Sequence, residues 1–163
     1  MILVPLNYLP QNLTKKDKKK QAQMLQKSRR LYKQHKYFER PALASYKNKT
    51  SKHVLNARKI YGVDKIIPGK ELVRATGCTL DALQKIVHKG EGAYYSSGSR
   101  PNQTARSWGI ARLASALTAG KSAAVDYSIL ESGCNHRKKA FLLAKKARQK
   151  YGYGHSKTRK VTY

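Results

Sequence analysis

The chain has 163 residues, of which 35 are lysine or arginine and 8 are aspartate or glutamate, so its formal net charge at pH 7 is +27. A free protein with this excess repels itself, which predicts an anionic partner: nucleic acid, a membrane surface or an acidic protein surface. Hydrophobic residues make up 40% of the chain, enough for a small core, and no apolar run approaches membrane-spanning length.

The charge is uneven along the chain. Residues 14–60 hold 16 basic and 2 acidic side chains, residues 61–135 hold 9 and 6, and residues 136–163 hold 10 and none. We therefore expect a mainly α protein: a small multi-helix domain with an extended basic N-terminal arm and C-terminal tail. The expected parts are an extended apolar arm (1–13), a basic helix and linker (14–50), a helical core domain (51–151) and a basic tail (152–163).

The apolar opening of the chain is predicted to be an arm, because Pro5 and Pro10 exclude a helix through it. With no basic residue before it, it is predicted to be neither a signal peptide nor a membrane span. Its exposed apolar side chains need cover, so we expect it to pack on the protein's own core or on a neighbour. Thr14, with Asp17 three residues on, predicts the cap of a helix that runs to about Tyr37. Its outward lysines favour a cationic clamp; the alternative is a solvated basic helix.

Three further helices are expected before residue 91. One covers residues 52–61 and ends at Gly62, one covers 70–76 and ends at Gly77, and one is capped by Thr79 and stops at Gly90. The last two outline a helix-turn-helix motif. A core helical hairpin is the favoured interpretation, because the outward residues are a mixed set: Asp81, Gln84, Lys85, His88 and Lys89.

The segment GAYYSSGSRPNQTARSWGIARLASALTAGK, residues 92–121, is nearly apolar, and its only charged side chains are Arg100, Arg106, Arg112 and Lys121. Tyr94 and Tyr95 are predicted to form a short strand or turn, followed by a polar loop. Thr104 then caps a helix over residues 105–119 that is apolar on almost all sides, which predicts a core helix with Trp108 as its anchor.

The loop before that helix does not match a Walker-type phosphate loop, because Ser99 and Arg100 stand where lysine and Ser/Thr are needed. It does lead into a helix N-terminus, so Arg100 and Arg106 are a candidate anion site. The plain alternative is a tight turn that delivers Trp108 to the core.

Towards the C-terminus we expect a helix over residues 122–131 and a basic amphipathic helix over 136–151. The tail, 152–163, has no core pattern and is expected to be mobile unless a partner holds it. The cations expected to bind an anionic partner form two groups. The first basic group is Lys15, Lys16, Lys18, Lys19, Lys20, Arg29, Arg30 and Lys33; the second is Arg137, Lys138, Lys139, Lys145, Lys146 and Arg148.

Cys78 and Cys134 are predicted to be reduced, half-buried thiols in a reducing compartment. A metal site formed with His88 and His136 is a weaker alternative, and we expect no metal and no cofactor. The chain has no paired-carboxylate, G-x-S-x-G or H-E-x-x-H motif. We therefore expect neither an enzyme nor a small-molecule substrate.

Three segments carry a resemblance: YLPQNLTKKDKKKQ, SKHVLNARKIYGVDKIIPGKEL and GEGAYYSSGSRPNQTARSWGIARLASALTAGKSAAVD. The chain resembles a small basic protein family of large double-stranded DNA viruses of the algal-virus (phycodnavirus) and mimivirus-like lineages. The resemblance covers nearly the whole length, and the block G-S-R-P-N-Q-T…S-W-G-x-A-R-L-A-S is specific to it. It implies a virion with an icosahedral capsid over an internal membrane, and it brings no catalytic residues.

Charge and resemblance together predict a virion structural protein, made in the infected host cell. As a minor capsid protein on the inner side of the capsid, it would cement capsomers through its basic ends. Its partners would be the major capsid protein, other minor capsid proteins or the anionic internal membrane, with weak contacts summed over the lattice. The alternative is a nucleic-acid-binding protein that condenses or packages double-stranded viral DNA.

Overall fold

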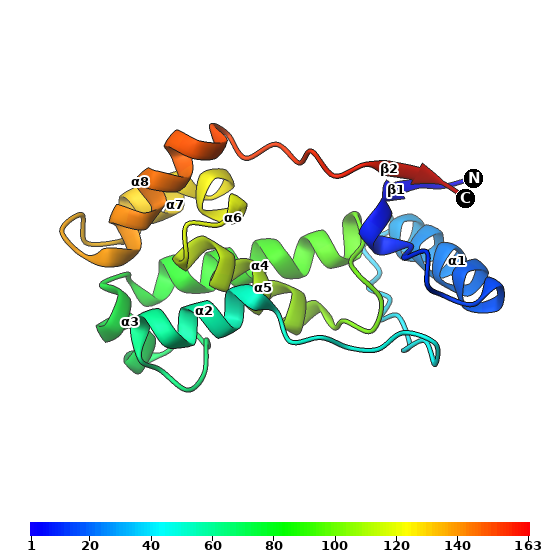
Figure 1. Cartoon of the computed structure of the whole chain (residues 1–163), viewed down its shortest axis with the longest axis horizontal. Coiled ribbons are helices and arrows are strands. Elements are labelled where there is room, and N and C mark those ends of the chain that lie inside the picture. The colour runs from blue at the N-terminus through cyan, green and yellow to red at the C-terminus, as the bar shows by residue number, and fades with distance from the viewer. The chain divides into compact units, whose positions relative to one another are not determined.

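The computed structural model describes residues 1 to 163 and is mainly α-helical, as expected (Figure 1). None of its helices combines the length and the apolar character needed to cross a lipid bilayer. In chain order the elements are β1 (Leu3–Pro5), the 3-10 helix η1 (Leu6–Tyr8), α1 (Lys15–Tyr32), α2 (Lys52–Tyr61), α3 (Lys70–Thr76), α4 (Leu80–Ser96), α5 (Ala105–Leu117), α6 (Lys121–Val125), α7 (Tyr127–Gly133), α8 (Lys139–Tyr151) and β2 (Lys160–Thr162).

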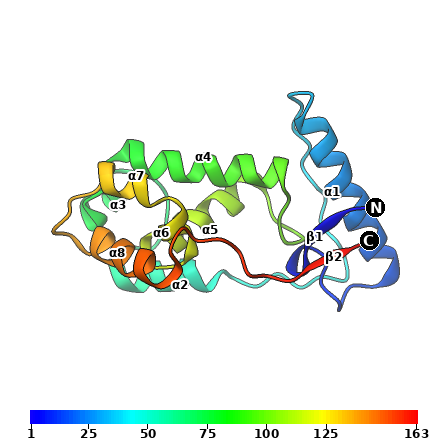
Figure 2. The same ribbon diagram turned by 90° about the horizontal axis from the view of Figure 1, so that it is seen from above.

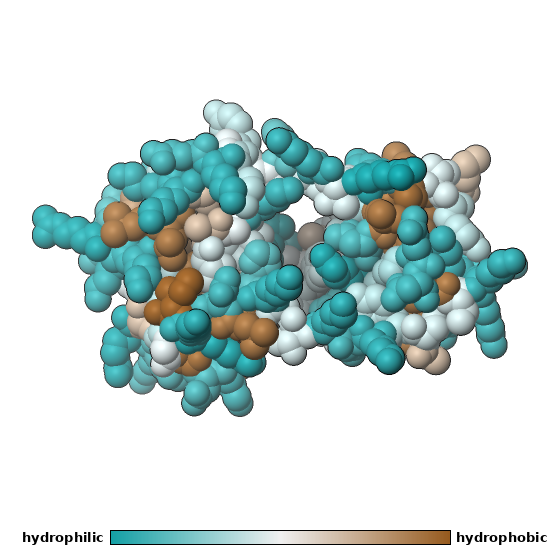
Figure 3. All heavy atoms as spheres, viewed as in Figure 1, coloured by the Kyte–Doolittle hydropathy of each residue, from teal (hydrophilic) through white to brown (hydrophobic).

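The chain divides into two units, each built from separate stretches of sequence. Unit 1 comprises Met1–Lys49, Glu91–Trp108 and Lys157–Tyr163; unit 2 comprises Thr50–Gly90 and Gly109–Ser156. This differs from the expected continuous core domain over 51–151, because residues 91–108 group with the N-terminal helix. Unit 1 holds 18 basic and 3 acidic side chains and unit 2 holds 17 and 5, so both units carry the positive excess. Hydrophilic side chains cover most of the face drawn in Figure 3.

The N-terminal arm and the C-terminal tail pair with each other in unit 1. β1 and β2 form an antiparallel two-stranded sheet with Val4 opposite Val161, and both ribbon views show the strands side by side (Figure 1, Figure 2). Ile2, Val4 and Leu9 are buried in a cluster with Leu25 of α1. The arm therefore packs on the protein itself, one of the two expected outcomes. The tail differs from expectation, because its last residues pair with β1 and are not left without structure.

The start of α1 is fixed by local chemistry. Thr14 Oγ1 accepts a hydrogen bond from the Asp17 N–H at 3.2 Å, which confirms the predicted cap. The Asp17 carboxylate accepts further bonds from the Ser45 N–H at 2.9 Å and the Ser45 hydroxyl at 2.6 Å. These two bonds tie the linker after α1 to the beginning of the helix, and they lower the pKa of Asp17.

The helix ends at Tyr32, before the predicted Tyr37. His35 has left-handed backbone geometry, with φ 57°, and the Lys36 N–H bonds to the Leu31 carbonyl at 2.9 Å. This is the pattern of a helix-terminating Schellman motif, with histidine in the position that glycine usually occupies. A histidine is a weak sequence signal for such an end.

Unit 2 encloses the larger hydrophobic core, to which each of its helices contributes. Buried examples in chain order are Ala57, Leu72, Leu83, Leu113, Ala123, Leu130 and Phe141. The predicted ends of α2 and α3 are confirmed, since Gly62 and Gly77 are both left-handed with φ of 61° and 74°. Thr79 caps α4 by accepting from the Ala82 N–H at 3.2 Å.

α4 does not stop at Gly90 as predicted but continues to Ser96, so Tyr94 and Tyr95 are helical and not in a strand or turn. Gly90 lacks the left-handed geometry of a helix-ending glycine. It lies against α5 instead, where a Cβ atom on Gly90 would be 2.5 Å from the Gly109 Cα. The glycine therefore serves helix packing.

The helix expected over 122–131 is two helices, α6 and α7, which meet at Asp126. The Asp126 side chain is fully buried. It accepts a bond from Lys89 Nζ at 2.7 Å and a bidentate pair from Arg112, both at 2.8 Å. The break in the helix thus coincides with a carboxylate that binds cations of α4 and α5.

Candidate anion-binding surfaces

The first basic group lies on α1, and six of its eight members are exposed: Lys15, Lys16, Lys19, Lys20, Arg30 and Lys33. The helix buries Ala22, Leu25 and Ser28 on one side. Residues three or four apart share a helix face, so a polar and cationic stripe runs along the opposite side. The stripe consists of Lys16, Lys20, Gln23, Lys27 and Arg30.

Arg29 has a structural role within this group. It is half-buried, and its Nε donates to the Ser97 carbonyl at 3.0 Å while Nη1 donates to the Leu3 carbonyl at 3.3 Å. These bonds link α1 to β1 and to the loop after α4. Arg29 therefore stabilises unit 1 in addition to adding charge.

Arg40, which the sequence analysis did not single out, is a buried cation in unit 1 with 7% of its surface exposed. Nη1 donates to Ser28 Oγ at 2.9 Å and to the Tyr94 carbonyl at 2.8 Å, and Nη2 donates to Ser99 Oγ at 2.8 Å. Its guanidinium also lies 3.8 Å from the centre of the Tyr94 ring. Burial lowers the pKa of Arg40. The position just before Pro41 in a polar linker gave no sign of this role.

The loop before α5 places both arginines of the candidate anion site, Arg100 and Arg106, in solvent. Thr104 is the predicted cap: its Oγ1 accepts from the Ser107 N–H at 3.0 Å, and Ser107 Oγ accepts from the Thr104 N–H at 2.9 Å. These reciprocal bonds already use N–H groups that an anion at this helix end would need. Ser99 of the same loop faces Arg40, so part of the loop has a structural role.

Trp108 is not the core anchor that we expected. It is half-buried in unit 1, where its ring packs edge-on against Tyr8 with 6.0 Å between ring centres. The fully buried large side chains of α5 lie further along, at Leu113 and Leu117. At the neighbouring Gly109 the backbones of α4 and α5 approach too closely to admit an indole between them.

The second basic group lies in unit 2, where α8 begins at Lys139 and not at the predicted His136. Its exposed members are Arg137, Lys138, Lys139, Lys145 and Lys146. Arg148 is half-buried: Nη1 donates to the Gly152 carbonyl at 3.3 Å, and the guanidinium lies over Tyr127 and Tyr153 at 4.6 and 4.7 Å from the ring centres. Arg148 thus also stabilises its own unit.

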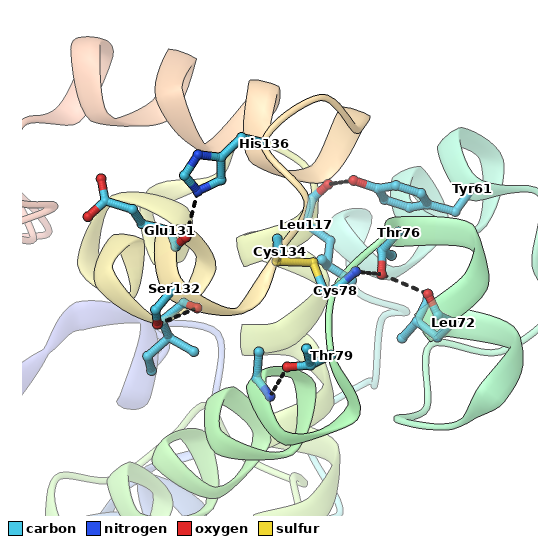
Figure 4. The surroundings of a disulfide bond; sticks show 12 residues. Tyr61, Leu72, Thr76, Cys78, Thr79, Leu117, Glu131, Ser132, Cys134 and His136 are labelled. Carbon is cyan, nitrogen blue, oxygen red and sulfur yellow. Dashed lines mark hydrogen bonds between the residues drawn. A yellow bond between two sulfur atoms is a disulfide. The ribbon is translucent and has the colours of Figure 1, made fainter.

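Cys78 and Cys134 form a disulfide, which corrects the prediction of two reduced thiols (Figure 4). Both residues are buried and pair as a β-bridge, with the Thr79 N–H bonded to the Gly133 carbonyl at 2.7 Å. This pairing joins segments 56 residues apart, which sequence spacing cannot reveal. It also removes the alternative metal site, because disulfide sulfurs are not thiolate ligands.

Figure 4 shows His136 bonded to the Glu131 carbonyl, at 2.6 Å. Its ring stacks on Phe141 with 4.0 Å between ring centres. In residues 1–163 no group of three or more His, Cys, Asp or Glu side chains could hold a metal ion.

The helix-turn-helix outline corresponds to α3 and α4. Two outward cations of α4 pair with carboxylates: Lys85 with Asp81 at 3.0 Å, and Lys89 with Asp126 at 2.7 Å. These pairs reduce the positive charge that a DNA-reading helix would present. The arrangement supports the interpretation as a core hairpin.

Comparison with known proteins gives a family but no activity. No curated protein and no solved structure matches the chain. A family model matches residues 5–133, which include the first basic group and end before Cys134 and the second basic group. The chain therefore belongs to the DUF5824 family, a family of unknown function.

Proposed function

We propose that the protein is a virion structural protein, a minor capsid protein on the inner side of an icosahedral capsid, whose exposed cations bind an anionic partner. The setting, an icosahedral capsid over an internal membrane, is what the resemblance to a small basic protein family of large double-stranded DNA viruses implies. The observation that carries the anion-binding part is the exposed cationic stripe of α1. At 1.5 Å per residue, the stripe from Lys16 to Arg30 is about 21 Å long.

The cations at the N-terminal end of α1 do not stabilise the helix, which supports a role for them in binding a partner. Lys15, Lys16 and Lys18 lie in the first turn of α1, at the positive end of the helix dipole. Cations there destabilise a helix by about 0.3–1 kcal/mol each. Asp17, the one acid in that turn, is held by Ser45. An anionic partner would offset this cost.

The paired termini change how such a protein would make its contacts. β1 and β2 hold both chain ends in unit 1, so we assign partner binding to the folded surfaces of the units and not to free arms. The test is the location of the protein in particles of the virus that encodes it. Quantitative mass spectrometry of genome-free shells is expected to find it in a fixed ratio to the major capsid protein. Its loss together with the genome would overturn the proposal.

The second candidate is a nucleic-acid-binding protein that condenses viral DNA. Both units carry a large excess of cations, which favours this candidate because phosphate neutralisation needs many of them. Duplex DNA should then bind with an affinity that falls steeply as salt rises, with a slope of about −0.9 per phosphate contacted. Absence of a mobility shift at low salt would exclude it.

A further inference from the structure

A groove of about 360 Å³ lies between β1 and the second half of α1 in unit 1. Its walls differ in chemistry. Met1 and Leu3 line one side, and Arg29, Arg30 and Lys33 line the other, while no carboxylate lines the groove. An apolar wall facing three cations is complementary to a ligand with both an apolar part and a negative charge.

The apolar wall follows from the alternation of the strand. Ile2 and Val4 point inwards and are 4% and 0% exposed, so Leu3 between them points out and is 54% exposed. Met1 is 99% exposed. A single exposed leucine is ordinary, but two large apolar side chains beside three cations form a mixed surface. In Figure 3, viewed as in Figure 1, hydrophobic atoms reach the surface near the paired strands.

The groove is held in shape by Arg29, which donates to the Leu3 carbonyl at 3.3 Å and to the Ser97 carbonyl at 3.0 Å. This fixes β1 against α1. Arg30 and Lys33 are exposed, so their charged ends are free to meet an external anion.

We propose that this β1–α1 groove binds the surface of an anionic phospholipid membrane. Arg30 and Lys33 contact headgroup phosphates while Leu3 and Met1 enter the boundary with the acyl chains. The proposal rests on the proposed function, since it names the partner of the first basic group. Nucleic acid is the poorer match, because phosphates alone would leave the apolar wall in water.

Membrane contact of this kind is weak for one molecule. Each cation near an anionic surface strengthens partitioning about fivefold, which corresponds to about 1 kcal/mol, and a partly inserted leucine has a similar effect. Several copies in one particle would sum these contributions. The groove is therefore suited to reversible peripheral binding.

The test is co-sedimentation of the full chain with vesicles of phosphatidylcholine and phosphatidylserine, compared with phosphatidylcholine alone. Arg30→Gln with Lys33→Gln is expected to reduce partitioning about 30-fold, from about 1 kcal/mol per cation. Leu3→Ser is expected to reduce it about fivefold, from about 1 kcal/mol for the partly inserted side chain. The matched controls are Lys65→Gln with Lys70→Gln and Leu55→Ser, at exposed residues of unit 2.

Equal losses in the controls, full binding by Leu3→Ser, or equal binding to neutral vesicles would overturn the proposal. Unchanged circular dichroism and thermal unfolding would establish that each variant is folded. Vesicle binding uses isolated protein, so it fails or succeeds independently of where the protein lies in the particle. The capsid assignment and the membrane assignment can therefore be refuted separately.

Discussion

Gly90 of α4 and Gly109 of α5 lie in direct contact: a Cβ atom on Gly90 would be 2.5 Å from the Gly109 Cα. Neither glycine has left-handed backbone geometry. Glycine is therefore required at this crossing for space and not for backbone freedom. The two helix backbones approach closely only because both side chains are absent.

Gly90→Ala is expected to lower the free energy of unfolding by about 1–3 kcal/mol, because the new methyl group must push the two backbones apart. Gly92→Ala is the matched control on the same helix, since nothing lies within 4 Å of a Cβ atom there. Alanine's higher helix propensity is expected to raise the free energy of unfolding at this position by about 0.5–1 kcal/mol. Urea denaturation measures both; changes of the same sign would contradict the packing explanation.

Helix boundaries that depend on neighbours in sequence were predictable. Thr14 caps α1 through the N–H of Asp17, and Gly62 and Gly77 end α2 and α3. In each case the hydrogen bond or the left-handed residue is within a few positions of the helix end. The signal is therefore contained in the local sequence.

Features that depend on distant residues were not predictable. Gly90 resembles a helix end until its contact with Gly109 is known. Arg40 resembles a linker residue in the sequence. Its buried role was not predictable, because its hydrogen-bond acceptors lie in other parts of the chain, in α1, α4 and the loop after α4. The cysteines are 56 residues apart, and burial alone suits a thiol as well as a disulfide.

The candidate site was predictable in part. Neighbouring lysines such as Lys19 and Lys20 cannot be buried without counter-charges, so their exposure follows from composition. The structural roles of Arg29 and Arg148 do not follow, because they donate to backbone carbonyls, which any residue type carries. Sequence therefore predicts where cations gather but not which of them are held by the protein.

Asp126→Asn is expected to lower the free energy of unfolding by about 1.5–3 kcal/mol, because Arg112 and Lys89, which keep partial access to water, lose the carboxylate that accepts their hydrogen bonds. The amide can accept fewer hydrogen bonds than the carboxylate and carries no charge. Asp81→Asn is the matched control: it breaks the exposed pair with Lys85 and should change stability little. Similar losses in the two variants, measured by denaturation, would show that burial of Asp126 does not matter.

Replacing both cysteines, as Cys78→Ala with Cys134→Ala, is expected to lower the free energy of unfolding. A crosslink across 56 residues corresponds to about 4 kcal/mol of loop-closure entropy in the unfolded chain. A reductant should shift the unfolding midpoint of the wild-type chain towards that of the variant and leave the variant unchanged. A wild-type midpoint that does not respond to a reductant able to open the bond would contradict a stabilising role.

Alkaline pH is expected to destabilise the fold through buried tyrosines. Burial raises the pKa of Tyr8 and Tyr61 above the ordinary value near 10. The folded state therefore keeps these phenols neutral while the unfolded state ionises. Their contribution to stability is complete below about pH 10 and is lost as pH rises through the raised pKa values.

Tyrosinate absorbance and circular dichroism, followed together above pH 10, measure this effect. Part of the absorbance change is expected to coincide with unfolding, because the buried phenols ionise only when the fold opens. Tyr61→Phe should weaken the alkaline loss of stability, since it removes a phenol whose pKa is strongly raised by burial, although it also removes the bond to the Leu117 carbonyl. Tyr153→Phe, at a side chain that is 74% exposed, is the control and should leave the pH dependence as it is. If all tyrosines ionised in one step near pH 10 while the helices stayed intact, the buried phenols would be open to solvent and this source of pH dependence would be absent.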